Sequence, residues 1–190
     1  LPGLGRIVLA RLLGGAFMQN LPIGHKIWVL FVALSMIIVT PVSAGDDPSF
    51  IAFHLGGFDV NDNETAGQLN IEYRSNRDDW YAKPFGGIMA TTDAAGYAYA
   101  GFMLDIFFGR RFVLTPNVAA GLYFDGDGKD LGSVIEFRSG IELAYRLDSR
   151  TRLGVAFHHI SNASISDNNP GTETLTLVLS LPLNNVFDAD

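Results

Sequence analysis

From residue 50 onward, apolar and polar residues alternate with a period of two, and clusters of Gly, Asn and Asp interrupt the alternation. A period of two places successive side chains on opposite faces of an extended strand. The pattern predicts eight β-strands, at Phe50 to Phe58, Ala66 to Arg74, Trp80 to Thr91, Gly96 to Phe108, Phe112 to Phe124, Gly132 to Leu147, Arg152 to Ser161 and Glu173 to Leu183. The strand-forming part of the chain, residues 45–190, is therefore predicted to be one all-β domain.

The predicted connections are of two kinds. Gly109-Arg110 and Asp148 to Arg150 are tight turns, whereas Asp125 to Asp130 and Asn162 to Thr172 are longer and polar. Such a division is expected when short turns lie at one end of a barrel and longer loops at the other.

One face of each predicted strand is apolar and the other is polar or charged. In the sixth strand, for example, Ile135 and Phe137 alternate with Glu136 and Arg138. A soluble β-sandwich alternates in the same way, so the pattern by itself leaves both architectures open. Strand length favours a membrane barrel, because several runs reach 12 to 16 residues, whereas soluble strands average about five or six and a tilted membrane-crossing strand needs about 9 to 11.

We therefore predict an eight-stranded antiparallel transmembrane β-barrel in a bacterial outer membrane. Oppositely charged residues of the inner face, among them Glu136, Arg138, Glu142 and Arg146, are expected to pair within the narrow lumen and to plug it. A soluble periplasmic sandwich is the alternative.

The first 44 residues differ from the rest of the chain in charge. They contain three basic residues and no acid, whereas residues 45–190 contain all 20 acids and have a net charge of -10. The apolar run 27–39 follows Lys26, and the small-residue sequence Val42-Ser43-Ala44 ends the segment. This is the order of a secretory signal peptide, so we predict a leader at 1–44 that is cleaved after Ala44.

An uncleaved membrane anchor is the alternative interpretation of this leader. The 13 residues of its apolar run, as a helix, span only about 20 Å of a hydrocarbon layer about 30 Å thick. The anchor is therefore the weaker interpretation. Met18 is a second candidate for the translation start.

The composition argues against several classes of binding site and of catalysis. A net charge of -7 and the lack of a basic cluster argue against a nucleic-acid-binding protein. The absence of cysteine excludes disulfides, zinc–thiolate sites and thiol catalysis, so any reaction must use oxygen and nitrogen groups. Asp125 to Asp130 resembles a calcium loop in its alternating carboxylates, but it lacks the distal glutamate, which favours a solvated loop.

Serine, histidine and an acid come together only between the last two predicted strands. His159 and Ser161 are two positions apart, so on a strand they share a face at about 6.6 Å along the backbone. Glu173 opens the partner strand of the same hairpin, where its carboxylate can accept the other imidazole N–H. The spacing therefore predicts a base, a nucleophile and an orienting acid.

All three residues have the parity of the apolar positions of their strands, so we expect them to face lipid. Polar groups in that position are costly unless they bond to one another and serve a function. A substrate that approaches sideways from the membrane would explain their placement, and a polar fringe at the membrane surface is the alternative. His158 has the opposite parity and is expected to face the lumen.

Two linked motifs carry a resemblance to a known family. The sequence His159-Ile160-Ser161-Asn162-Ala163, followed by Asn169-Pro170-Gly171-Thr172-Glu173, resembles the PagL-type lipid A 3-O-deacylases, which are outer-membrane barrel enzymes. The 12 positions from Ser161 to Glu173 also match the family. Ser164 departs from it, because many relatives have glycine at that position.

The resemblance implies a serine esterase that removes the 3-hydroxyacyl chain at position 3 of lipid A. It implies that His159 is the base, Ser161 the nucleophile and Glu173 the third member of a triad, with Asn162 and Asn169 in or near the oxyanion site. The scheme requires no cofactor and no metal. We expect lipid A or lipopolysaccharide and membrane lipids as partners, no nucleic acid, and a monomer or homodimer. A non-enzymatic barrel with a structural or adhesion role is the alternative.

Overall fold

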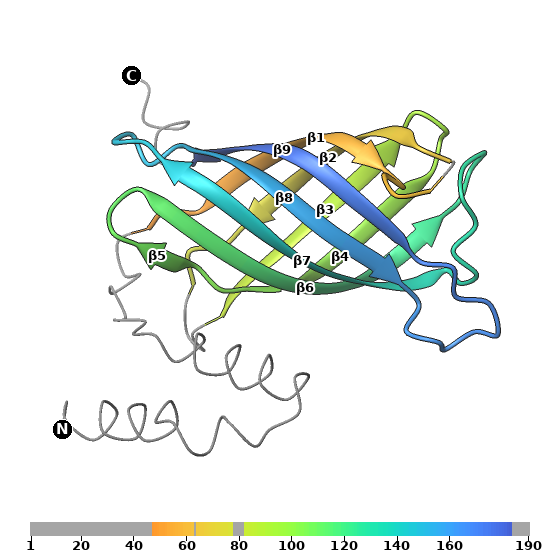
Figure 1. The fold of residues 1–190 in the computed structure, drawn as a ribbon. Helices are drawn as coiled ribbons and strands as arrows, with labels where there is room; N and C mark the ends of the chain where they lie inside the picture. The colour runs from red at the N-terminus through yellow and green to blue at the C-terminus, as the bar shows by residue number, and fades with distance from the viewer. Residues whose placement is uncertain (1–46, 63, 78–81, 184–190) are drawn as a thin grey trace, which may run out of the picture. The chain divides into compact units, whose positions relative to one another are not determined.

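The structure is a computed structural model that describes residues 47–62, 64–77 and 82–183 (Figure 1). The chain divides into two units, 1–41 and 42–190, and every described strand belongs to the second unit. The predicted leader and its cleavage after Ala44 lie outside the described residues, as do Trp80 and Tyr81 of the third predicted strand. These features therefore stay predictions.

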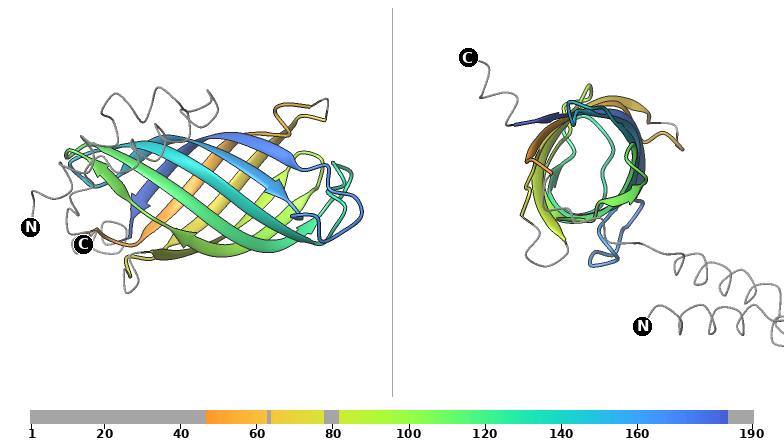
Figure 2. Two further views of the ribbon diagram at one scale, coloured as in Figure 1. Left: turned by 60° about the horizontal axis from the view of Figure 1, so that its bottom comes forward. Right: turned by 90° about the vertical axis from the view of Figure 1, so that its left-hand side faces the viewer.

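The described residues form nine antiparallel strands, which are β1 (Phe50–Phe58), β2 (Ala66–Arg74), β3 (Lys83–Thr91), β4 (Gly96–Met103), β5 (Ile106–Phe108), β6 (Phe112–Phe124), β7 (Ile135–Arg146), β8 (Arg152–Ser161) and β9 (Thr172–Pro182). Consecutive strands pair with each other, except that β4 and β5 both pair with β6, and β1 pairs with both β2 and β9. The sheet therefore closes on itself into a barrel (Figure 2).

Strands β4 and β5 are two parts of one wall strand, because both pair with β6 in a single continuous register. Met103 lies opposite Asn117 and Ile106 opposite Leu114, which places Leu104 opposite Pro116. Proline has no N–H to donate to the ladder, and only the Leu104 N–H donates here, to the Pro116 carbonyl at 3.1 Å. The wall thus has eight strands, as predicted, and one of them is interrupted opposite a proline.

The barrel is apolar outside and polar inside. In β2, Leu69, Ile71 and Tyr73 are exposed, while Asn70 and Glu72 between them are buried. A protein dissolved in water hides its apolar face, so this inverted arrangement suits an apolar surrounding and rules out the soluble sandwich. The alternation predicted from the sequence is confirmed.

The lumen holds buried ion pairs beside a cluster of buried aromatic and apolar side chains. At its centre Glu72 accepts hydrogen bonds from Arg74, Arg138 and Tyr99, and Arg74 also bonds Glu142 at 2.7 Å. The partners of the β7 charges come from across the barrel, since Arg138 reaches Glu72 of β2 and Glu142 reaches Arg74.

A second cluster of ion pairs lies nearer the start of β1. Asp47 and Asp105 share Lys83 and Arg152 there. The expected pairing holds for Arg138 and Glu142, and Arg146 lies 3.4 Å from Asp47 in the second cluster, whereas neither carboxylate oxygen of the buried Glu136 has a hydrogen-bond partner among the described residues.

The two ends of the barrel differ. Two short turns, Gly109 to Arg111 and Leu147 to Thr151, lie at the end where β1 begins, which we call the turn end, together with the longer connection between β2 and β3. The segments 59–65, 125–134 and 162–171 lie at the other end, which we call the loop end, together with the short connection between β3 and β4 (Figure 1). Among the described residues, no helix is long and apolar enough to cross a membrane.

Candidate active site

The β8–β9 hairpin places His159 directly opposite Glu173 at the loop end. Nδ1 of His159 lies 2.9 Å from Oε1 of Glu173. A carboxylate only accepts hydrogen bonds, so Nδ1 is the donor in this contact, and in the neutral ring Nε2 then carries the lone pair. The pair is thus arranged as a base with an orienting acid.

Both side chains lie on the outer wall of the barrel. The side chain of His159 is 45% exposed and that of Glu173 is 24% exposed, and their same-face neighbours Phe157 and Leu175 are exposed apolar residues. His158 is buried in the lumen, where its Nδ1 lies 3.5 Å from Oγ1 of Thr174. The parity of the strand therefore separates the two adjacent histidines as predicted.

Ser161 ends β8 on the same outward face as His159 and is half-buried, opposite Phe137 of β7. Among the hydrogen bonds of the described residues, none joins its hydroxyl to His159. Contacts of this kind are often long before substrate binds and tighten in the complex. The structure thus brings His159 and Glu173 into contact and sets Ser161 on the same strand face beside them.

Asn162 fixes the shape of the loop that follows Ser161. It is fully buried, and Nδ2 donates to the carbonyls of Leu131 at 2.9 Å and Asn168 at 2.8 Å. Its Oδ1 accepts from the Ser164 N–H at 3.0 Å. Because both amide protons are used within the protein, the Asn162 side chain supports the loop here and has no proton left for a substrate.

Asn169 folds back over the start of the same loop. Its Oδ1 accepts from the backbone N–H of Asn162 at 3.0 Å, whereas its Nδ2 makes only a long contact of 3.4 Å with Oγ of Ser164. Asn169 is exposed. Its Nδ2 is therefore the better placed of the two predicted amides to donate to a substrate oxygen.

The loop turns sharply after Asn162. Ala163 and Ser164 have φ angles of 53° and 62°, in the left-handed region that glycine enters at least cost. This conformation explains why a glycine suits position 164, where the chain has serine. The Ser164 N–H is occupied by Asn162.

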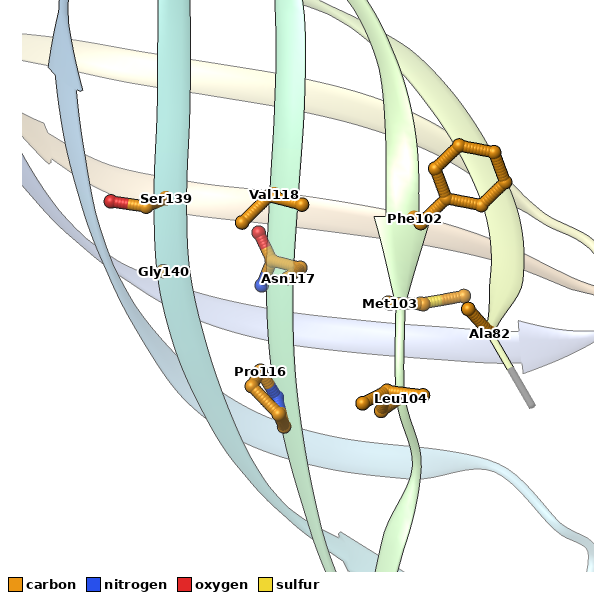
Figure 3. A pocket seen from close by; sticks show the side chains of 9 residues that line it. All are labelled: Ala82, Phe102, Met103, Leu104, Pro116, Asn117, Val118, Ser139 and Gly140. Carbon is orange, nitrogen blue, oxygen red and sulfur yellow. The ribbon is translucent and has the colours of Figure 1, made fainter. Parts of the chain in front are cut away.

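An apolar groove of about 430 Å³ opens on the same outer wall, across β4, β6 and β7 (Figure 3). Exposed side chains of Phe102 and Val118 flank it, and Ser139 lies at its edge. Ser139 is also the residue directly opposite His159 in the β7–β8 ladder. The groove thus begins one strand away from the base.

Ser139 is not among the residues predicted from the sequence, although the alternation pattern contains a signal for it. Ser139 interrupts the outward row that Phe137 and Ile141 continue on either side. A polar residue within a lipid-facing apolar row marks a position where lipid packing is not the only constraint.

A family model and a known relative both point to the same protein family. A sequence model of the family described as Lipid A 3-O-deacylase (PagL) matches residues 57–182. A lipid A deacylase PagL of Bordetella bronchiseptica is 31% identical over 71 residues, which are 36% of this chain and 40% of that protein. The chain thus matches less than half the length of this curated relative.

Among solved structures, the crystal structure of the outer membrane enzyme PagL superimposes with a TM-score of 0.57 at 16% identity. The superposition covers 70% of this chain and 99% of that one, and it supports the barrel fold. The outer membrane protein Ail of Yersinia pestis matches at a TM-score of 0.45 and 12% identity, over 72% of this chain and 100% of that one.

Proposed function

The chain belongs to the lipid A 3-O-deacylase (PagL) family, and from this membership we propose that it hydrolyses the 3-hydroxyacyl ester at position 3 of lipid A as a serine esterase. The barrel is an outer-membrane protein of a bacterium. The observation that carries the proposal is the His159–Glu173 hydrogen bond on the outward, lipid-facing wall beside Ser161.

In the proposed mechanism, Oγ of Ser161 attacks the ester carbonyl and Nε2 of His159 takes the hydroxyl proton. Glu173 keeps the ring in the Nδ1–H tautomer and stabilises the imidazolium that forms. Collapse of the tetrahedral intermediate breaks the bond to the sugar oxygen, which His159 protonates. Water then attacks the acyl-serine with His159 again as base, and the 3-hydroxy fatty acid leaves.

The oxyanion of the intermediate needs donors close to Ser161. We assign this role to Nδ2 of Asn169, and we assign to Asn162 the support of the loop that carries it. The scheme uses only side chains of the protein and calls on no cofactor.

The outer wall suits a substrate that stays in the membrane. An ester bond at the headgroup boundary reaches Ser161 sideways, while its acyl chain lies along the exposed apolar side chains of the wall. The groove that begins at Ser139 is the part of this wall best shaped to hold such a chain. We propose that the enzyme acts on lipid A as a monomer or homodimer.

The test is mass spectrometry of lipid A from bacteria that express the protein. The wild type is expected to remove one 3-hydroxyacyl chain, and Ser161→Ala is expected to lower turnover about a thousandfold or more because the nucleophile is gone. Ser149→Ala, at an exposed position of the turn end, is the matched control. Unchanged lipid A with a folded wild-type barrel, or normal activity of Ser161→Ala, contradicts the proposal, and the first result favours the non-enzymatic barrel.

A further inference from the structure

Asp59, the first residue after β1, is a buried carboxylate that the proposed chemistry does not use. It is fully buried and adopts a φ of 56°. Its Oδ1 accepts from Nζ of Lys129 at 2.7 Å and from Oγ1 of Thr172 at 2.9 Å. One carboxylate oxygen therefore joins three segments of the loop end.

Two contacts, one from Asp59 and one from the next residue, Val60, hold the backbone at Glu173. Thr172, fully buried, is the residue before Glu173, and its hydroxyl is held by Asp59. The carbonyl of Glu173 itself accepts from the Val60 N–H at 3.1 Å. The start of β9 is thus tied to the end of β1 both just before and at the acid that orients His159.

Lys129 supplies the charge that keeps Asp59 buried. An isolated buried carboxylate is costly, and a close cation offsets that cost. Lys129 also reaches Asp62 at 3.2 Å. Burial by itself lowers the pKa of Lys129, but hydrogen bonds to Asp59 and Asp62 outweigh it and raise the pKa above its ordinary value. Lys129 therefore stays charged at neutral pH.

The segment that carries Lys129 also holds the loop after Ser161. The carbonyl of Leu131 accepts from Asn162, and the carbonyl of Gly132 accepts from Oγ of Ser166 at 2.8 Å. Residues 129–132 therefore hold the loop after Ser161 through Asn162 and Ser166. They also reach Thr172, the residue before Glu173, through the contact of Lys129 with Asp59.

We propose that Asp59 is a positioning residue of the hydrolytic site, which acts through Thr172 to hold Glu173 against His159. The inference rests on the proposed triad, because Glu173 has no partner to orient if His159 is not the base. Asp59, in the β1–β2 loop, would thus affect the reaction although it does not touch the substrate. Misplacement of an orienting group by about 1 Å costs up to about a hundredfold in rate.

The test compares two substitutions of Thr172 in the purified, refolded enzyme with lipid A in detergent micelles. Thr172→Val has almost the same volume but lacks the hydroxyl, and it is expected to lower kcat about tenfold or more while KM stays within about twofold. Thr172→Ser keeps the hydroxyl and is expected to restore kcat. Thr176→Val changes another buried, inward-facing threonine of β9, further from Glu173, and is expected to leave kcat unchanged.

A double-mutant cycle separates positioning from general stabilisation. In a Glu173→Gln background, whose residual turnover is measured over longer incubations, Thr172→Val is expected to have no further effect, because the group it positions has been altered already. Asp59→Asn is run through the same cycle, so that the result does not depend on the folding of one variant. Heat-modifiable migration on gels confirms that each barrel is folded.

Two results overturn the inference. One is a Thr172→Val enzyme with the wild-type kcat, and the other is an equal loss of activity from Thr172→Val with and without Glu173→Gln. If Ser161→Ala is inactive in the same assay while either result holds, only the positioning role fails. If Ser161→Ala is as active as the wild type, the proposed function fails and the positioning role fails with it.

Discussion

Gly171 shows how one residue without a side chain shapes the site. Its φ is 64°, and a Cβ added there would lie 3.0 Å from Cε1 and 3.6 Å from Nε2 of His159. That contact is on the side of the imidazole that receives the serine proton in the proposed mechanism. This glycine of the second motif therefore serves the backbone turn and also leaves room for the ring.

Gly171→Ala is expected to lower activity sharply, because the methyl group displaces the His159 ring, and to cost about 1 to 2 kcal/mol through the left-handed φ. Gly109→Ala is the matched control, since Gly109 has a φ of 65° with open space around it at the turn end. Deacylation assays and thermal unfolding of both variants separate the two effects. Equal activity of the two variants would show that crowding of His159 is unimportant.

At the scale of elements, local alternation was sufficient to predict β1, β2, β6 and β8 at their observed bounds. It could not predict the interruption after β4, because the cause is Pro116 on the neighbouring strand. It also placed the start of the sixth predicted strand at Gly132, whereas β7 begins at Ile135, because Gly132 has a φ of 85° and belongs to the loop.

Some contacts of the candidate site could likewise be predicted from the sequence, and others could not. The contact of His159 with Glu173 follows from hairpin spacing and was predictable. Asp59 was not, because its partners Lys129 and Thr172 are 70 and 113 positions away in sequence. Nothing in the local sequence of Asp59 distinguishes it from the other acids of the loop end.

The loop after Ser161 is an element whose order depends on one side chain. Asn162→Ala removes three hydrogen bonds, each worth about 1 kcal/mol. We expect a folded barrel with low kcat and faster proteolysis within residues 162–171, measured by limited digestion and mass spectrometry. Asn168→Ala, at an exposed position of the same loop, is the control. A protease-resistant loop in Asn162→Ala would contradict this account.

At the scale of the whole molecule, the barrel is polar in its centre and carries its candidate chemistry on its outside. Within the lumen, Arg138 pairs with Glu72 across the barrel and also lies over the ring of Tyr99 at 4.1 Å. Charges that are paired in this way resist separation, because removal of one partner leaves the other buried and uncompensated. We therefore expect the lumen to serve stability and the outer wall to serve the proposed hydrolysis.

Arg138→Met tests this division, because it leaves Glu72 without one of its two arginines. It is expected to lower the free energy of unfolding by about 3 kcal/mol while the folded fraction keeps its deacylase activity. Arg111→Met breaks a pair with Asp148 that is exposed to solvent, and it is expected to change stability far less, because water screens the two charges. Denaturant titration in detergent gives both values, and similar losses for the two variants would refute the argument.

The seam of the barrel, where β1 pairs with β9, determines when the contacts around Glu173 can form. Glu173 stands on β9, the final strand, and the strand that covers the other edge of β9 is β1, the first. Val60 and Asp59 therefore reach the backbone around Glu173 only when the two ends of the domain have met. A chain in which that seam is still open lacks the contacts that we propose to position Glu173.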